Sequence, residues 1–237
     1  DNGSRNAALS EHYTLDFLTV DHVGSELAFA GGSYDSEISE SNLWRSNDGG
    51  NSWLSMAPVD GDVRDIYFVD SLQGYALTAT ELYETTDGGV AWASVDLSVD
   101  VANDDLRAVL VREDGLLLVA NSLGLYRNAS GNWETMVSYV LEGTLELQFA
   151  GEDAVLLANG QSYVANDAGL SVWNVQSSWP TAITMSWANA QTGLIASEAQ
   201  LYRTTDGGDS WAQYGPSQTP EGDTLSIGRL AVASDSV

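Results

Sequence analysis

Lysine does not occur in this 237-residue sequence. All eight basic residues are arginines, against 34 aspartates and glutamates, and the formal net charge is −26 at pH 7. Because such a charge repels phosphate groups, we expect neither nucleic acid nor an anionic membrane surface as a partner. Two explanations of the charge stay open. One is adaptation to salt in a marine or halophilic source, since screening tolerates dense surface carboxylates. The other is an acidic face that recruits a basic partner or Ca²⁺.

Cysteine is also absent, which excludes disulfides and thiolate metal sites. The only histidines are His12 and His22, and we interpret them as surface residues rather than as a metal pair. There is no phosphate-cradling glycine loop, and two histidines offer too few bases for a Ser-His-Asp set. We therefore expect no cofactor and no bound metal. Asp60-Gly61-Asp62 and Asp104-Asp105 resemble calcium-loop fragments without the ligand spacing of a dedicated site, so Ca²⁺ stays a weak alternative.

Long apolar runs and proline are scarce. No run reaches the roughly 18 apolar residues of a transmembrane helix. The first five residues, Asp1 to Arg5, lack the basic and apolar regions of a signal peptide. With only four prolines and no linker, we expect one domain over residues 1–237.

What the sequence does contain is a motif that ends in tryptophan and occurs five times. The closing tryptophans are 39, 41, 40 and 38 residues apart. Three copies are complete, with Ser or Thr, Asp, Gly and Trp at fixed spacing; the third is shortened and lacks the aspartate, and the fourth has Ala165 at the hydroxyl position and one insertion. The residues assigned to the motif are Ser46, Asp48, Gly50, Trp53, Thr85, Asp87, Gly89, Trp92, Trp133, Asp167, Gly169, Trp173, Thr204, Asp206, Gly208 and Trp211.

Two short apolar runs precede the motif in each unit, for example residues 65–69 and 74–77, or 145–149 and 154–157. With the strand that enters the motif and the strand that carries its tryptophan, each unit has four strands. Four antiparallel strands per forty residues is the unit of a β-propeller blade. We therefore predict an all-β fold, a β-propeller with blades at about 12–58, 59–99, 100–140, 141–179 and 180–216. Residues 1–11 and 217–237 are expected to supply closing strands, in a five- or six-bladed propeller, or a seven-bladed one if the chain is a fragment.

The three complete motifs match the Asp-box, or bacterial neuraminidase repeat. The longer phrase from Leu201 to Trp211, together with runs such as Phe68 to Ala76, resembles the photosystem II stability/assembly factor-like branch of these propellers. The resemblance covers residues 12–216 and implies a non-catalytic scaffold. That family uses a basic patch, whereas this chain is strongly acidic and has no lysine, so we take from the resemblance the scaffold function as a class and not a photosystem II role.

We interpret the Asp-box as a structural hairpin. Its aspartate can accept hydrogen bonds from turn amides, its glycine can supply a positive φ, and its tryptophan can act as an apolar anchor. A sialidase would need three arginines converging on a carboxylate, but Arg45, Arg127 and Arg203 occupy the same slot in separate repeats. We therefore expect no catalytic residues, although a pair of carboxylates suited to other glycosidases stays open among 34 acidic residues.

One position on the first strand of each unit varies in charge between repeats. It holds Asp65, Arg107, Glu146 and Thr184 in units two to five. Innermost strands line the channel of a propeller, so these four residues are the candidate binding residues, with a water-filled channel as the alternative.

Together these patterns favour a secreted or periplasmic, non-enzymatic propeller that binds a protein partner, such as an accessory subunit of a larger assembly. The alternative is a carbohydrate-binding or glycan-hydrolysing propeller.

Overall fold

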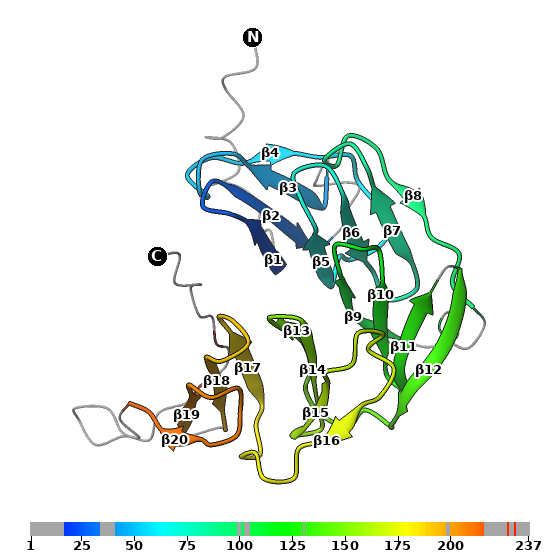
Figure 1. Ribbon diagram of the computed structural model, residues 1–237. Helices are drawn as coiled ribbons and strands as arrows, with labels where there is room; N and C mark the ends of the chain where they lie inside the picture. The colour runs from blue at the N-terminus through cyan, green and yellow to red at the C-terminus, as the bar shows by residue number, and fades with distance from the viewer. Residues whose placement is uncertain are drawn as a thin grey trace. The chain divides into compact units, whose positions relative to one another are not determined.

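The computed structural model describes residues 17–33, 41–98, 101, 105–129, 131–197, 200–215, 227 and 230. Its described part contains twenty strands in five four-stranded antiparallel sheets (Figure 1). This confirms the predicted all-β class and the four strands per repeat. The terminal segments predicted to close the fold, 1–11 and 217–237, lie outside the described residues apart from Ile227 and Leu230.

Each sheet is a meander in which strands follow one another in chain order. The first contains β1 (Phe17–Val23), β2 (Leu27–Gly32), β3 (Leu43–Ser46) and β4 (Leu54–Ser55). The second contains β5 (Asp65–Phe68), β6 (Gly74–Leu77), β7 (Leu82–Thr85) and β8 (Ala93–Ser94). The third contains β9 (Leu106–Val111), β10 (Leu117–Asn121), β11 (Gly124–Ala129) and β12 (Asn132–Ser138). The fourth contains β13 (Leu145–Ala150), β14 (Asp153–Ala158), β15 (Gln161–Ala165) and β16 (Asn174–Val175). The fifth contains β17 (Thr184–Trp187), β18 (Gly193–Ala196), β19 (Leu201–Thr204) and β20 (Ala212–Gln213).

The chain divides into two compact units, Asp1–Glu134 and Thr135–Val237, with the division inside β12. Strands β1 to β11 belong to the first unit, strands β13 to β20 belong to the second, and β12 spans the division. A single domain over the whole chain therefore stays a prediction.

Apolar side chains fill the space between successive sheets within each unit. Phe29 of β2 and Phe68 of β5 share one buried cluster, and Leu77 of β6 shares another with Val109 of β9. In the second unit, Leu157 of β14 packs in a cluster with Met185 of β17. Both faces of a sheet can thus be buried, which explains why the central strands β6, β10 and β14 are apolar at nearly every position.

Within the described part of the chain, no helix has the length and apolar character that crossing a bilayer requires.

Candidate functional site

The complete motif copies form hairpins held by one hydroxyl and one carboxylate. In the second sheet, Thr85 Oγ1 donates to Asp87 Oδ1 at 2.8 Å and accepts the Gly89 N–H at 2.9 Å. Asp87 Oδ1 also accepts the N–H of Ala91 at 3.0 Å. Ser46 and Thr204 make the corresponding contacts in the first and fifth sheets. Every donor and acceptor lies within four residues of the aspartate or hydroxyl, so the network can form within the hairpin alone.

The two glycines of each complete hairpin adopt positive φ, for example 74° at Gly207 and 92° at Gly208. Only glycine adopts this backbone conformation without steric cost. A Cβ on Gly208 would meet the ring of Trp179, which lies in the segment between the fourth and fifth sheets. Trp211 packs edge-on against the same ring, with 5.2 Å between centroids. The hairpin of the fifth sheet therefore packs against the segment that leaves the fourth sheet.

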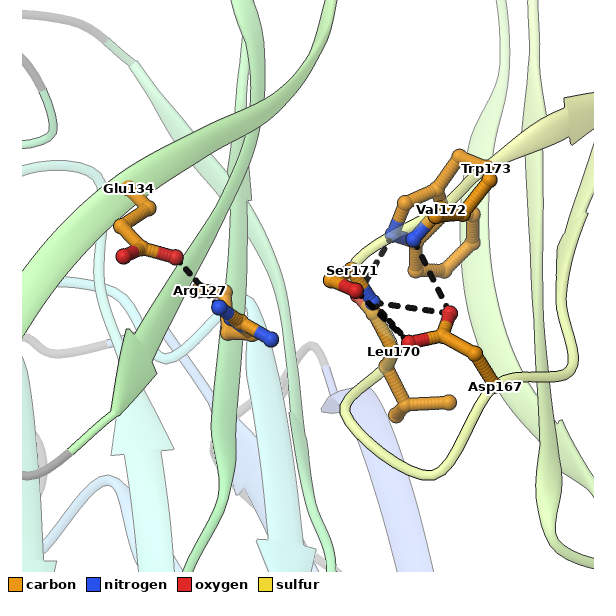
Figure 2. A network of polar contacts seen from close by, with 7 residues as sticks. All are labelled: Arg127, Glu134, Asp167, Leu170, Ser171, Val172 and Trp173. Carbon is orange, nitrogen blue, oxygen red and sulfur yellow. Dashed lines mark hydrogen bonds and ion pairs between the residues drawn. The ribbon is translucent and has the colours of Figure 1, made fainter.

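The fourth hairpin keeps its aspartate and its tryptophan, although it has Ala165 at the hydroxyl position and one inserted residue (Figure 2). Asp167 accepts hydrogen bonds from Ser171 N–H at 2.9 Å, Ser171 Oγ at 2.7 Å and Val172 N–H at 2.9 Å. The positive φ falls on Leu170, at 47°, and not on Gly169, to which the sequence pattern assigned it. The one-residue insertion shifts the turn, and this shift accounts for the change. Trp173 Nε1 donates to Leu170 O at 3.0 Å and closes the hairpin.

The third hairpin has a different construction. Arg127 of β11 forms an ion pair with Glu134 of β12 (Figure 2), and Asn128 Oδ1 accepts the N–H of Gly131 at 2.9 Å. Trp133 Nε1 donates to the carbonyl of Asp96, beyond the end of the second sheet, at 3.1 Å. An ion pair between strands and a short asparagine turn thus take the place of the hydroxyl–carboxylate network.

Three of the four candidate binding residues form contacts between neighbouring segments of backbone. Asp65 Oδ2 accepts the N–H of Val109 in β9 at 2.8 Å, and Glu146 Oε2 accepts the N–H of Met185 in β17 at 2.7 Å. Thr184 Oγ1 accepts the N–H of Leu230 at 3.3 Å. Asp65 and Glu146 therefore tie the first strand of one sheet to the first strand of the next.

Two further first-strand residues, absent from the sequence-based candidates, make the same kind of tie. Asp21 Oδ2 of β1 accepts the N–H of Phe68 in β5 at 2.6 Å. Gln148 of β13 accepts the N–H of Trp187 at 3.3 Å and donates to the carbonyl of Met185 at 3.2 Å. The available signal was alternation, because Glu146 and Gln148 are two residues apart and so face the same side of their strand.

Burial changes the acidity of these first-strand carboxylates. Loss of hydration raises the pKa of Asp65 to about 7, and it also raises the pKa of Asp21. Both Asp65 oxygens are occupied, since Oδ1 accepts the N–H of Ile66 at 3.0 Å and Oδ2 accepts that of Val109. In this arrangement the carboxyl group binds backbone rather than a ligand.

The fourth candidate, Arg107 of β9, is placed differently. Its side chain is 43% exposed and forms an ion pair with Asp105, which also pairs with Arg64. Arg64 is 32% exposed and donates to the carbonyl of Leu106 at 3.3 Å. Two guanidinium groups share one carboxylate, so this cluster of Arg64, Asp105 and Arg107 carries a net positive charge in a strongly acidic chain.

Asp105 is also part of one of the calcium-loop fragments, whose other member, Asp104, lies outside the described residues. Among the residues with a described position, no group of three or more His, Cys, Asp or Glu is placed to hold a metal ion.

No family model and no curated protein matches the sequence. Solved structures match over most of the chain. YCF48 bound to a D1 peptide has 20% identity and a TM-score of 0.60, over 86% of this chain and 68% of that one. The fold is that of a β-propeller.

Two other propellers are similar to a comparable degree. YCF48 from Cyanidioschyzon merolae has 13% identity and a TM-score of 0.57, over 89% of this chain and 87% of that one. An ancestral GH74 enzyme has 15% identity and a TM-score of 0.59, over 84% of this chain but only 31% of its own length. YCF48 and an enzyme share this fold, so the likeness shows the architecture of this chain and does not assign an activity to it.

Proposed function

We propose that this propeller is a non-enzymatic scaffold that binds a segment of a partner protein. The observation that carries the proposal is the Arg64–Asp105–Arg107 cluster. Among the four equivalent first-strand residues, Arg107 is the exposed one, while Asp65, Glu146 and Thr184 hold backbone N–H groups. Arginine pairs with carboxylates in a fixed two-point geometry, so the cluster suits a peptide that offers a side-chain or terminal carboxylate.

The similarity to a YCF48 structure that contains a bound peptide supports a peptide ligand for this chain as well. An accessory subunit of a larger complex outside the cytoplasm fits the proposal, with the acidic surface suited to a saline environment. The partner itself is identified only by its chemistry, a protein segment with an accessible carboxylate.

Glycan binding or hydrolysis is the second candidate, and it rests on the similarity to the ancestral GH74 enzyme. A hydrolase of this kind needs two carboxyl groups that are free to reach the glycosidic bond. Asp65 uses both of its oxygens, and Asp21 uses one, to hold backbone N–H groups, so neither suits that task.

Affinity capture from the cells that produce the protein, followed by mass spectrometry, tests the proposal. The wild type is compared with the double variant Arg64→Gln/Arg107→Gln. A control variant, Arg203→Gln, removes an exposed arginine from the fifth sheet. We expect a stoichiometric protein partner with the wild type and the control, and at least about tenfold less with the double variant, because a hydrogen bond to a charged group contributes on the order of 1.5–3 kcal/mol.

Equal recovery with all three proteins would remove the arginine cluster from the interface. Recovery of the protein alone, or with glycans only, would contradict the scaffold and favour the second candidate, to be followed by a glycan array and a hydrolase panel.

A further inference from the structure

The outermost strand of the third sheet, β12, is unlike its four counterparts. It runs for seven residues, Asn132–Ser138, whereas β4, β8, β16 and β20 have two residues each. It is the terminal strand of its sheet, next to β11, and Figure 1 shows it as a long arrow. The third sheet is also the one whose hairpin lacks the motif aspartate. The loss of the motif and the lengthened edge therefore occur together.

An edge strand of this length leaves backbone groups available for pairing. In an antiparallel pair, alternate residues direct their N–H and C=O away from the partner strand, so seven residues leave roughly three such residues open. Proteins usually protect an edge with a short strand, with proline, or with charged side chains. The other four sheets each end in a short strand of two residues. The β12 segment contains no proline and one charged residue, Glu134.

The surroundings of β12 are acidic. The Glu134 side chain is 51% exposed, and its partner Arg127 is only 13% exposed, so the carboxylate is the accessible member of the ion pair. Asp96, whose carbonyl accepts the Trp133 indole N–H, is exposed as well. Met136 and Val137 are half-buried and add apolar surface. A basic, extended segment complements this edge, whereas a second copy of this chain would bring its own charge of −26.

We propose that β12 accepts an extended, lysine- or arginine-rich segment of a partner protein as an added strand of the third sheet. Backbone hydrogen bonds along the edge would hold the segment, and Glu134 and Asp96 would select its charge. The proposal takes from the proposed function only that the ligand is a protein, and it uses residues other than the Arg64–Asp105–Arg107 cluster.

The experiment uses the whole protein and three synthetic ten-residue peptides. The first alternates lysine and valine, the second has the same sequence with N-methyl groups on alternate amides, and the third replaces lysine by glutamate. Binding is measured by fluorescence anisotropy, and hydrogen–deuterium exchange follows the amides of residues 132–138. The variant Thr135→Lys adds a charge to the exposed edge. The matched control Ser94→Lys adds the same charge to the exposed two-residue strand β8.

We expect the lysine peptide to bind the wild type and the Ser94→Lys control within about twofold of each other, and to bind Thr135→Lys at least about tenfold more weakly. Binding should slow exchange at alternate amides of β12, and the other two peptides should bind at least tenfold more weakly. Four results would overturn the proposal. They are no binding of the lysine peptide, equal effects of the two lysine variants, equal binding of the N-methylated peptide, and self-association of the protein that Thr135→Lys abolishes. These outcomes do not depend on the arginine cluster, so they are separable from failure of the proposed function.

Discussion

The motif hairpins and the first strands of the sheets both use carboxylates to hold backbone N–H groups, but in opposite environments. In the hairpins, Asp206 lies at the surface, and hydrogen bonds from Ser210 and Thr204 lower its pKa to about 2. On β5, the first strand of its sheet, burial of Asp65 outweighs its hydrogen bonds and raises its pKa to about 7. The same side chain therefore titrates at very different pH in two places, and the difference is the loss of hydration.

The two groups also differ in the range over which they act. Asp206 contacts residues up to four positions away, whereas Asp65, Asp21 and Glu146 contact residues 44, 47 and 39 positions away. The hairpin carboxylates thus shape one turn, and the first-strand carboxylates join successive sheets. Each of the following predictions tests one side of this contrast.

The largest effect is expected at a hairpin glycine. Gly208 and Gly131 have nearly the same φ, 92° and 86°, but a Cβ at Gly208 would meet the Trp179 ring, and at Gly131 it would meet nothing within 4 Å. We expect Gly208→Ala to lower the free energy of unfolding by about 3 kcal/mol or more, and Gly131→Ala by about 1–2 kcal/mol, because only the first adds overpacking to backbone strain. Urea denaturation measures both. Equal losses of unfolding free energy in the two variants would show that packing of the hairpin against Trp179 does not contribute to stability.

A smaller loss is expected when the hairpin network loses its hydroxyl. Thr85 is buried, and its Oγ1 accepts the N–H of Gly89 at 2.9 Å. Thr85→Val keeps the shape of the side chain and leaves that N–H unpaired, which we expect to cost about 1–3 kcal/mol of unfolding free energy. Thr85→Ser is the control and should lose less than Thr85→Val. A neutral valine variant would mean that the carboxylate alone holds the turn.

The two carboxylate classes should give opposite slopes of stability against pH. The pKa of Asp65 is raised from 3.8 to about 7, so its contribution is complete below about pH 4 and is lost as pH rises towards 7. The pKa of Asp206 is lowered from 3.8 to about 2, so its contribution is complete above about pH 4 and is lost as pH falls towards 2. Asp65 changes the unfolding free energy by at most about 1.4 kcal/mol per pH unit.

Urea denaturation from pH 2 to 8 measures these slopes in the wild type and in two variants. Asp65→Asn should reduce the fall in unfolding free energy above pH 4 and leave the pH dependence below pH 4 unchanged. Asp206→Asn should reduce the fall in unfolding free energy below pH 4 and leave the pH dependence above pH 4 unchanged. A variant that changes the pH dependence equally below and above pH 4 would contradict the separation of hairpin carboxylates from first-strand carboxylates.

The smallest effect is expected in the third hairpin, which lacks the network. Asn128 Oδ1 accepts one N–H from a residue with a described position, that of Gly131, at an exposed turn. Asn128→Ala should lower the unfolding free energy by about 0.5–1.5 kcal/mol, and by less than Thr85→Val does. Denaturation of both variants under the same conditions makes the comparison. A loss as large as that of Thr85→Val would show that the short asparagine turn is as strong as the complete motif.

Much of the fold could be predicted because its signals are local. The runs at 65–69 and 74–77 became β5 and β6, and those at 145–149 and 154–157 became β13 and β14, each within two residues. The role of Leu170 could not be foreseen, because an inserted residue can be absorbed at several points of a turn. The backbone contacts of Asp65, Glu146 and Thr184 could not be foreseen either, since alignment shows which positions are equivalent and not which neighbour each side chain meets.

The sequence by itself determined the forty-residue repeat, its four strands and the hairpin chemistry, because these depend on contacts a few residues apart and on period-two alternation. Only the tertiary structure decided that Asp65 and Glu146 join sheets while Arg107 stays exposed beside Arg64 and Asp105. Those outcomes depend on residues about forty positions apart coming into contact, and on how much water each side chain loses when they do.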